Sequence, residues 1–469
     1  MYTPTIGLEV HAELKTKSKM FCGCTNAPHA SQPNTNICPV CLAHPGTLPV
    51  ANEEAIKCVL LFGTAVGGTL ADYTEFDRKN YFYPDIPKAY QISQYAFPFV
   101  TGGELKNVAL TRVHLEEDTA RSQHDKGNHS LVDFNRAGVP LMELVTEPVI
   151  HDAETAGAFA RELQLMLRTL GISDANMEKG EMRVEANISV SNTGERAKKY
   201  VEVKNLNSFK SVEGAINFEI QRQIALLEAG GEVAQETRGW DEVHLKTVVQ
   251  RSKETAKDYR YFPDPDLPKI KTSEIESFSK SRLAEILPIL ATEKRLQYKM
   301  IGLPNAQIEV IIQNQILDTY FESLYALGIT EPSSLVLAAN YLVTDLSPLL
   351  AEKKPADSLL TPAHFYQLIQ LIVTKKITSR VAKDIIIAIA LADSDPLSYA
   401  TEHSLISTLT SDDITAIAAT IIEANPSVVA EYRGGKIASI QFLLGQAMKQ
   451  TKGAADPSML KSTFERLLA

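Results

Sequence analysis

Apolar and polar residues alternate with a period of two along most of the chain as far as Pro268, and this pattern predicts β-strands. Two of these segments are TIGLEVHAEL, at residues 5–14, and MRVEANISV, at residues 182–190. Their apolar faces would build the core. Their polar faces carry Glu9, His11, Glu185 and Asn187. These four side chains converge if both strands lie in one sheet, although a solvated outer face of an antiparallel sheet shows the same alternation.

Two helices interrupt the strands, and helical periodicity replaces the alternation after Lys280. Residues 153–170 and 212–229 are predicted as helices, and each is followed by glycine, which commonly ends a helix. One later apolar stripe has helical spacing: Leu335, Ala338, Ala339, Leu342 and Leu346. We therefore predict an α+β fold, in which an N-terminal domain built mainly on an antiparallel sheet precedes an all-helical C-terminal region.

Most of the cysteines fall in one short segment. Its four cysteines are Cys22, Cys24, Cys38 and Cys41. They form two knuckles, C-x-C and C-P-V-C, which is the arrangement that tetrahedral zinc prefers, although the single spacer of the first knuckle is unusual. Four protein ligands leave no position for water, so we expect a structural zinc that holds the loop from Met20 to Asn52. Buried free thiols or a redox site are the alternatives, and Cys58 reads as a small core residue.

A third acidic cluster, the EED string at residues 116–118, follows the predicted strand LTRVHL. Strict alternation groups Glu116 with His114 and turns Glu117 to the opposite side, but parity is a weak guide where a strand ends. Separated acidic sites at strand positions suit Mg²⁺, which prefers oxygen ligands. His11 is a poor direct ligand for Mg²⁺, so it would contact a metal-bound water or a phosphate, or ligate a softer ion such as Mn²⁺.

The segment RKNYFYPDIPKAYQISQ, at residues 78–94, concentrates cations, aromatic rings and prolines. Cations bind phosphate and aromatic faces stack on bases, so the segment suits a phosphorylated ligand that contains a base. A surface loop with half-buried tyrosines is the alternative. The similar strings YFYPDIPK, at residues 81–88, and YFPDPDLPK, at residues 261–269, indicate two related loops on one face, unless their likeness is chance.

Several catalytic signatures are missing from the sequence. It contains no G-x-x-x-x-G-K-[ST] loop, protein-kinase signature set, G-x-S-x-G elbow or glycine-serine-rich amidase signature. Phosphate binding, if present, therefore uses another scaffold. The N-terminal cysteines are committed to metal, so we find no nucleophile that would release ammonia from glutamine.

The chain is acidic overall, because 57 Asp and Glu against 47 Lys and Arg give a net charge of −10. Any contact with RNA therefore requires a local patch. Residues 430–469 offer one, with six Lys or Arg against three acids, although a solvated helical face has the same composition. No apolar run approaches the roughly 18 to 20 residues that span a bilayer, and no leader precedes the first strand. We expect no membrane contact and a cytoplasmic location.

The motifs taken together resemble one family, the B subunit of the aspartyl/glutamyl-tRNA(Asn/Gln) amidotransferases. In chain order these motifs are IGLEVHAEL, CPVCLAHPGTLPVAN, FDRKNYFYPDIPKAYQISQ, HLEED, FNRAGVPLMELVTEP, EANISV, EVKNLNSF and KDYRYFPDPDL. The C-terminal string YRGGKIASIQFLLGQAMKQTKGAADP is similar to the tail of that family. The likeness extends over essentially the full chain.

The resemblance implies an ATP-dependent ligase of translation that forms carbon–nitrogen bonds as a heterotrimer. This subunit would phosphorylate the side-chain carboxylate of Glu-tRNA(Gln), Asp-tRNA(Asn) or both. The A subunit would hydrolyse glutamine and send ammonia through a channel to the acyl phosphate, giving Gln-tRNA(Gln) or Asn-tRNA(Asn), and the C subunit would brace the other two. A non-catalytic tRNA-binding scaffold is the main alternative, and a zinc protein unrelated to tRNA is a third.

The resemblance also implies site residues and domains. The residues expected to hold Mg²⁺ and act in catalysis are Glu9, His11, Glu117 and Glu185, with Glu116 and Glu178 close by. The expected contacts of ATP or of the tRNA acceptor end are Arg78, Lys79, Tyr81, Tyr83, Lys88 and Arg121. The expected domains are a cradle domain at 1–292 with the ATP, Mg²⁺ and zinc sites, a helical domain at 293–400, and a helical tail domain at 401–469 that binds tRNA.

The chain departs from the family pattern at several positions, and the departures at Lys179, Thr119 and Ala120 favour the scaffold alternative. Glu185 stands where aspartate is common, and Lys179 stands where a second glutamate often occurs. Thr119, Ala120 and Arg121 replace the usual Ala-Gly-Lys. The lost glycine removes a point of close backbone approach to phosphate, whereas Arg121 can still donate to a phosphate, and bidentately.

Overall fold

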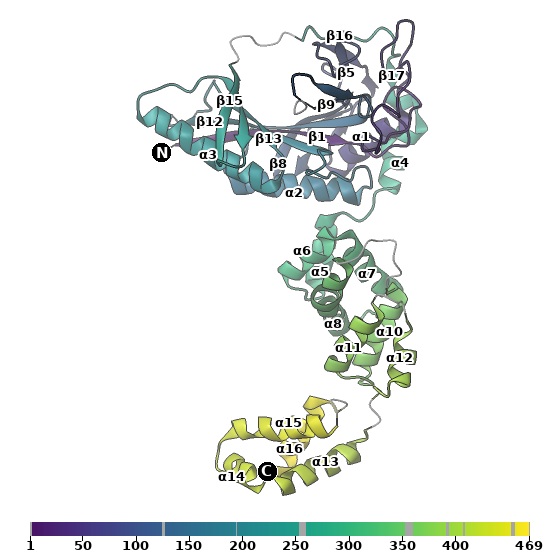
Figure 1. The fold of residues 1–469 in the computed structure, drawn as a ribbon, viewed down its shortest axis with the longest axis vertical. Coiled ribbons are helices and arrows are strands. Elements are labelled where there is room, and N and C mark those ends of the chain that lie inside the picture. Colours follow the sequence, from purple (N-terminus) through teal and green to yellow (C-terminus); the bar gives the residue numbers. More distant parts are fainter. Residues whose placement is uncertain are drawn as a thin grey trace. The chain divides into compact units, whose positions relative to one another are not determined.

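The computed structural model describes residues 2–123, 127–193, 195–252, 259–351, 360–390, 394–406, 409–451 and 455–468. The chain divides into two compact units, Met1–Ala291 and Thr292–Ala469 (Figure 1). The first unit mixes strands and helices and the second is helical, which confirms the predicted α+β fold.

Within the described residues of the first unit, ten strands form one sheet. In spatial order they are β15 (Lys246–Ser252), β14 (Glu236–Asp241), β13 (Val201–Leu206), β12 (Met182–Ser191), β1 (Thr3–Glu13), β11 (Pro140–Thr146), β8 (Val108–Glu117), β6 (Val100–Thr101) and β2 (Thr69–Leu70), while β7 (Glu104–Leu105) also pairs with β8. The β13–β14 pair is parallel, and the other described pairs are antiparallel. The two strands predicted from alternation, β1 and β12, are neighbours, so they do share a sheet.

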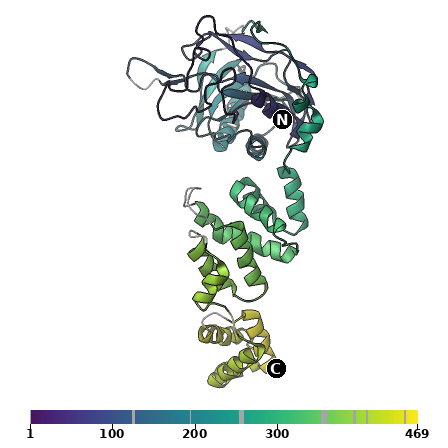
Figure 2. The ribbon, with the colours of Figure 1, turned by 90° about the vertical axis from the view of Figure 1, so that its right-hand side faces the viewer.

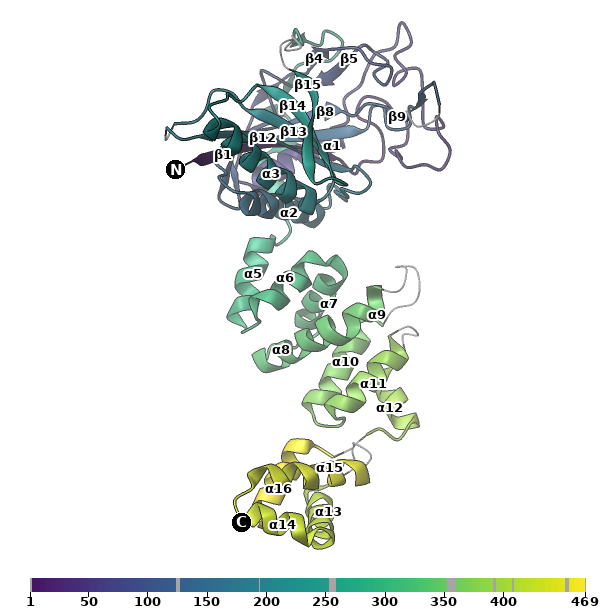
Figure 3. The same cartoon turned by 60° about the vertical axis from the view of Figure 1, so that its left-hand side comes forward.

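Helices cover one face of this sheet. Helices α2 (Ala153–Thr169) and α3 (Phe209–Glu228) lie side by side on that face (Figures 1 and 3), and α1 (Glu53–Ala65) packs against β8. The apolar faces of the strands and helices meet in one continuous buried core. The side chain of Ser208 accepts a hydrogen bond from the backbone N–H of Ser211, so α3 begins at Phe209 rather than at residue 212 as predicted.

Smaller sheets lie outside the large one. The strands β16 (Phe262–Pro263), β4 (Asp77–Asn80) and β5 (Tyr90–Ser93) form a sheet across the large sheet from α2 and α3 (Figures 1 and 3). This small sheet brings the similar strings at residues 81–88 and 261–269 together. The remaining elements are β3 (Tyr73–Thr74) paired with β17 (Ile270–Lys271), β9 (Arg121–Gln123) paired with β10 (Leu131–Asp133), the 3-10 turns η1 (Thr272–Glu274) and η2 (Glu276–Phe278), and α4 (Lys280–Glu285).

The second unit is built from helices in its described residues (Figure 2). They are α5 (Ala291–Met300), α6 (Asn305–Gln313), α7 (Gln315–Ala326), α8 (Pro332–Tyr341), the π-helix η3 (Leu342–Leu346), α9 (Ser347–Ala351), α10 (Pro362–Val373), α11 (Ser379–Ile389), α12 (Pro396–Glu402), α13 (Ser411–Ala424), α14 (Pro426–Arg433), the 3-10 turn η4 (Ile437–Ser439), α15 (Ile440–Gln450) and α16 (Pro457–Leu468). The predicted apolar stripe on α8 and η3 is fully buried. Helices α13 to α16 share a separate core.

The predicted division of the chain into domains at 1–292, 293–400 and 401–469 stays a prediction. No helix in the described part of the chain combines the length and the apolar character that a membrane crossing needs.

Candidate functional site

Four neighbouring strands carry polar side chains on the face turned away from α2 and α3. Glu9 on β1 lies opposite Glu185 on β12, and His11 on β1 lies opposite Glu143 on β11. Glu143 in turn lies opposite His114 on β8. The antiparallel register thus gathers on one surface side chains that are far apart in the sequence, including the group expected from the alternation of β1 and β12.

One group of ligand atoms, which we call the inner cluster, consists of His11, Glu116 and Glu143. The Nε2 atom of His11 lies 3.5 Å from a carboxylate oxygen of Glu116 and 3.3 Å from one of Glu143. His114 supports the cluster from β8, with its Nε2 atom 3.2 Å from Glu143, and the hydroxyl of Ser93 donates to Glu116 at 3.0 Å. Both carboxylates are buried and therefore held in place.

A second group, the outer cluster, consists of Glu9, Glu185 and Glu202. In both clusters the potential ligand atoms lie within 4.8 Å of one another. The side-chain amide of Asn187 donates to Glu9 at 2.8 Å. The ammonium of Lys204 lies 2.5 Å from Glu185 and 3.3 Å from Glu202, so this cation faces two of the three carboxylates at close range.

The electrostatics of these clusters favour a bound cation. Burial, followed by the negative charges of Glu143 and Glu185, raises the pKa of Glu9. Burial opposes the charged form of His11, but Glu143 and Glu116 outweigh it and raise the pKa of the imidazole to about 9. Carboxylates gathered in this way repel one another, and a divalent cation with oxygen ligands would relieve that repulsion. The donor set therefore fits Mg²⁺.

Both clusters open into a cavity of about 550 Å³. Its floor is the polar face of the large sheet, and the β4–β5 region supplies Lys79, Tyr81 and Gln91. The cavity is also lined by Tyr95, Arg112, Asp118, Arg183, Lys204, Tyr259 and Tyr261. Burial would lower the pKa of Lys79, but Glu116 and Glu143 raise it above its ordinary value, so this ammonium stays charged beside the acids. Acids, cations and aromatic rings therefore line the same cavity.

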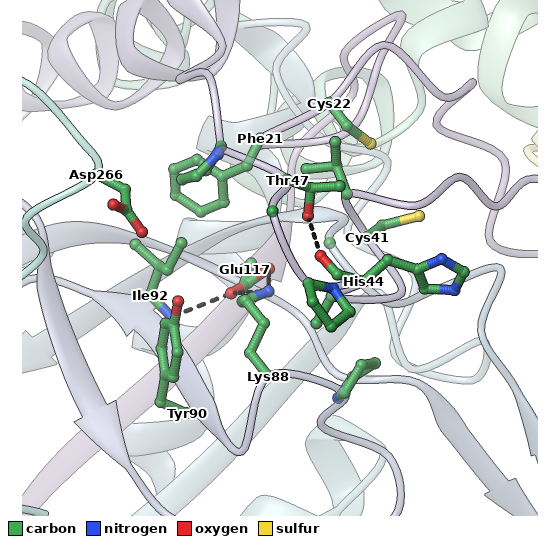
Figure 4. A pocket seen from close by; sticks show the side chains of 17 residues that line it. Phe21, Cys22, Cys41, His44, Thr47, Lys88, Tyr90, Ile92, Glu117 and Asp266 are labelled. Atoms are coloured by element: carbon green, nitrogen blue, oxygen red, sulfur yellow. Dashed lines mark hydrogen bonds and ion pairs between the residues drawn. The ribbon is translucent and has the colours of Figure 1, made fainter.

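Glu117 lies outside this cavity lining, which corrects its expected grouping with Glu9 and His11. Neighbouring residues of a strand point to opposite sides, so Glu116 enters the inner cluster while Glu117 turns away. Glu117 instead lies 2.7 Å from the ammonium of Lys88 and accepts from the backbone N–H of Ile92 at 3.1 Å. This pair lines a smaller cavity of about 270 Å³ (Figure 4).

The other expected ligand contacts are dispersed. Tyr81 and Lys79 line the large cavity, and Lys88 lines the smaller one. Arg78 is paired with Asp264 and Asp266 at 2.8 Å each and stacks over Tyr90. The rest of the expected residues lie outside the lining of the large cavity: Tyr83, which is exposed, Arg121, whose guanidinium lies 3.3 Å from a ring nitrogen of His29, and Glu178, which is exposed.

The four predicted cysteine ligands come together as a group, with their sulfur atoms within 4.8 Å of one another. The Sγ atoms of Cys38 and Cys41 are 3.9 Å apart, close to the ~3.8 Å that tetrahedral Zn–S bonds of ~2.3 Å imply. A hydrogen bond from Cys22, opposed by burial and supported by the backbone N–H of Cys38, lowers the pKa of Cys41 to about 4. The spacing of the four sulfur atoms therefore fits zinc, which binds cysteine as the thiolate.

Sequence reasoning missed two members of the clusters, Glu143 and Glu202, and the cation Lys204 beside the outer cluster. Two of them had a visible signal, because Glu202 and Lys204 alternate with the apolar Val201 and Val203 on β13. Glu143 is the lone charge within the apolar string PLMELV, and such a charge is buried only when it has partners.

Comparisons with known proteins agree with this geometry. A family model described as the GatB/GatE catalytic domain matches residues 4–276, and a GatB domain model matches residues 319–468. The B subunit of the aspartyl/glutamyl-tRNA(Asn/Gln) amidotransferase of Thermus thermophilus is 41% identical over 98% of this chain and 98% of its own length. Its counterpart in Thermomicrobium roseum is 41% identical over 100% of this chain and 99% of its own length. The counterpart in Crocosphaera subtropica is 39% identical over 100% of this chain and 98% of its own length. The chain therefore belongs to the family of aspartyl/glutamyl-tRNA(Asn/Gln) amidotransferase B subunits.

Proposed function

We propose that this chain activates the side-chain carboxylate of Glu-tRNA(Gln), Asp-tRNA(Asn) or both with ATP and then amidates it, as the catalytic ligase subunit of the complex. The observation that carries this proposal is the pair of acidic clusters that open into one cavity. The lack of a glutaminase nucleophile agrees with it, since the ammonia must then come from a partner.

The reaction has two steps. A carboxylate oxygen of the aminoacyl side chain attacks the γ-phosphorus of ATP, the bond to the β-phosphate oxygen breaks, and ADP leaves with that electron pair. Ammonia then attacks the carbonyl carbon of the acyl phosphate, the bond from that carbon to the phosphate oxygen breaks, and phosphate leaves. The nitrogen loses a proton, and the product is the amide.

The carboxylates of both clusters would bind the metal ion that this reaction requires. Glu9, Glu185 and Glu202 of the outer cluster and Glu116 and Glu143 of the inner cluster would hold Mg²⁺. When bound, Mg²⁺ neutralises phosphate charge and aligns the γ-phosphoryl group with the attacking carboxylate.

Cations of the cavity would complete the phosphate site. The ammonium of Lys79 stays charged beside the inner cluster and can donate to a phosphate oxygen. His11, whose Nε2 atom lies 3.5 Å from Glu116 and 3.3 Å from Glu143, would contact another phosphate oxygen. Both act in a largely buried cavity, where such charges are more effective than in water.

The partners follow from the same proposal. The chain would assemble with a glutaminase A subunit and a C subunit in the cytoplasm, and a zinc ion on the four cysteines would stabilise the loop that they close. Misacylated tRNA would contact basic side chains of a tail domain at 401–469: Arg433, Lys436, Lys449, Lys461 and Arg466. Lys452, the sixth of these, lies outside the described residues.

The test uses the assembled complex, tRNA(Gln) charged with labelled glutamate, Mg-ATP and ammonium, which bypasses the glutaminase. Deacylation and chromatography then quantify labelled glutamine. We expect Glu9→Gln and Glu185→Gln to slow ATP-dependent amidation roughly 100-fold and to raise the Mg²⁺ concentration required, because each removes one charged ligand. The matched control is Glu104→Gln, an exposed acid on β7 of the same unit, which should behave as the parent.

Amidation at the parental rate in both cluster variants would refute the metal site. If neither Glu-tRNA(Gln) nor Asp-tRNA(Asn) is converted by the parent complex while both bind it, the chain is the non-catalytic scaffold instead. Conversion of Asp-tRNA(Asn) alone would keep the mechanism and assign the substrate.

A further inference from the structure

Lys19 is fully shielded from solvent, with an exposure of 0%. Among the described residues, no carboxylate forms an ion pair with its ammonium. The polar contacts of that ammonium are the Sγ atom of Cys41 at 3.8 Å and the backbone carbonyl of Phe134 at 3.2 Å. Lysine is almost never fully buried unless its charge is paired, so a negative charge is required close to this ammonium.

The cysteine cluster supplies that negative charge when it holds zinc. The four sulfur atoms lie within 4.8 Å of one another. As thiolates around Zn²⁺ they carry more negative charge than the metal ion neutralises, because four single charges face one divalent cation. The ammonium of Lys19 would offset half of this excess on the buried side of the cluster. Zinc therefore explains the burial of Lys19, and Lys19 reduces the cost of burying the thiolates.

Cys41 is the ligand at which this charge acts. It is the buried member of the cluster, whereas Cys22, Cys24 and Cys38 are partly exposed. Water can solvate the exposed sulfur atoms, but a buried thiolate needs donors from the protein. The Sγ atom of Cys41 accepts from the backbone N–H of Cys38 at 3.2 Å, and the ammonium of Lys19 is its second donor. The cation thus lies beside the sulfur atom that water reaches least.

The backbone holds Lys19 between the two cysteine knuckles. Its N–H donates to the carbonyl of Cys24 at 2.9 Å, and its carbonyl accepts from the side-chain amide of Asn52 at 3.2 Å. The next residue, Met20, donates its N–H to the carbonyl of Gly138 at 2.7 Å. The main chain of Lys19 therefore contacts the first knuckle while its side chain contacts the second, so the ammonium is already in place when the metal binds.

We infer that Lys19 is the counter-cation of the zinc site, and that its positive charge raises the affinity of the four cysteines for the metal. An ammonium has no lone pair, so Lys19 acts on zinc through the thiolate of Cys41 rather than as a ligand. This inference rests on the zinc ion of the proposed function and adds a residue that retains the metal without binding it.

The test uses the full chain in its assembled complex. Lys19→Met removes the charge and keeps an unbranched side chain of similar size, and Lys17→Met makes the same change at an exposed position of the same segment. The zinc content is measured by metal analysis and the zinc affinity by competition with a coloured chelator. The sulfur-to-metal charge-transfer band is recorded after replacement of zinc by Co²⁺. The unfolding temperature is measured with zinc and after its removal.

We expect Lys19→Met to weaken the zinc affinity about 10- to 100-fold. The cobalt band should move to longer wavelength, because a thiolate without a neighbouring cation gives up its electrons more easily. Lys19→Met should lower the unfolding temperature of the zinc-loaded chain only, since removal of zinc also removes the charge that Lys19 offsets. Lys17→Met should match the parent in every measurement.

An unchanged zinc affinity together with an unchanged cobalt band in Lys19→Met would overturn the inference. An equal loss of unfolding temperature with and without zinc would also overturn it, because that result would assign Lys19 to packing alone. A parent chain that binds no zinc would refute the proposed zinc site itself, and the inference with it. None of these measurements requires amidation, so their outcome is independent of the proposed catalytic role.

Discussion

Glu219 on α3 offers a direct test of how the sheet and its helices hold together. The side chain is fully buried, yet it is a carboxylate. Arg222 donates to both of its oxygens at 2.7 and 2.9 Å, Gln223 donates at 2.9 Å, and the hydroxyl of Thr247 on β15 donates at 3.0 Å. The guanidinium of Arg238 on β14 lies 3.7 Å away. This network ties α3 to the two strands at the edge of the large sheet.

The magnitude follows from what a deletion leaves behind. Glu219→Ala would remove the acceptor shared by the Arg222 guanidinium, the Gln223 amide and the Thr247 hydroxyl, while Arg238 keeps Glu236 and Thr247 as partners. Removal of one partner from a buried ionic group costs about 3–5 kcal/mol. Glu219→Gln keeps the shape and part of the hydrogen bonding, so its loss should be smaller, about 1–3 kcal/mol. The control is Glu228→Ala at the end of the same helix, an exposed change that should stay within about 0.5 kcal/mol.

The single tryptophan of the chain makes the assay specific. Trp240 lies on β14, is buried, and packs against Phe218 of α3 with ring centroids 6.3 Å apart. Its fluorescence during guanidinium unfolding therefore reports the α3–β14 contact and nothing from the second unit. Free energies of unfolding from the three variants, with equal slopes against denaturant, give the comparison. A loss below about 1 kcal/mol for Glu219→Ala would refute the assignment of the network as stabilising.

Three further predictions concern other parts of the chain. Cys38→Ser should abolish bound zinc in metal analysis and lower the unfolding temperature, whereas Cys58→Ala should keep a full complement of zinc; equal zinc in both would contradict the cluster. Phe464 of α16 is fully buried, so Phe464→Ala should lower the free energy of opening of the α13–α16 core, measured by hydrogen exchange, by about 3–5 kcal/mol. Phe442 of α15 is half exposed, and Phe442→Ala should lower the same free energy by only about 0.5 kcal/mol. Lys449→Gln should reduce the slope of log affinity for tRNA against log salt by about 0.7–0.9, and an unchanged slope would exclude a phosphate contact there.

The polar faces of single strands could be predicted well from the sequence. Alternation identified Glu9 and His11 on β1 and Glu185 on β12, because period two needs no knowledge of the partner strand. Parity also separated Glu116 from Glu117, and the structure agrees with that separation, whereas the family resemblance assigned the metal to Glu117. The alternation of side chains along a strand therefore predicted the position of these two glutamates better than the resemblance did.

The pattern within single strands could not predict which residues form the inner cluster. Glu143 meets His11 and His114 because β11 lies between β1 and β8, and that strand order follows from chain crossovers rather than from any single segment. The same holds for Tyr95, which stacks on Tyr261 although the two segments are far apart in the sequence. The strand β16, which lies in the second of the two similar strings, pairs with β4, which directly precedes the first.

The two sheets give the cavity two kinds of lining, and the proposed chemistry needs both. The large sheet supplies closely spaced carboxylates on buried strands, which suits a cation and phosphate groups that must be held rigidly. The small β16–β4–β5 sheet supplies aromatic faces, which suit a base that must be recognised but takes no part in the reaction. Since Lys79 on β4 lines the cavity beside the inner cluster, any shift of the small sheet moves base contacts and a phosphate contact together. Loss of an aromatic side chain of the small-sheet region should therefore raise the KM for the substrate that carries the base, whereas loss of a cluster carboxylate should lower kcat.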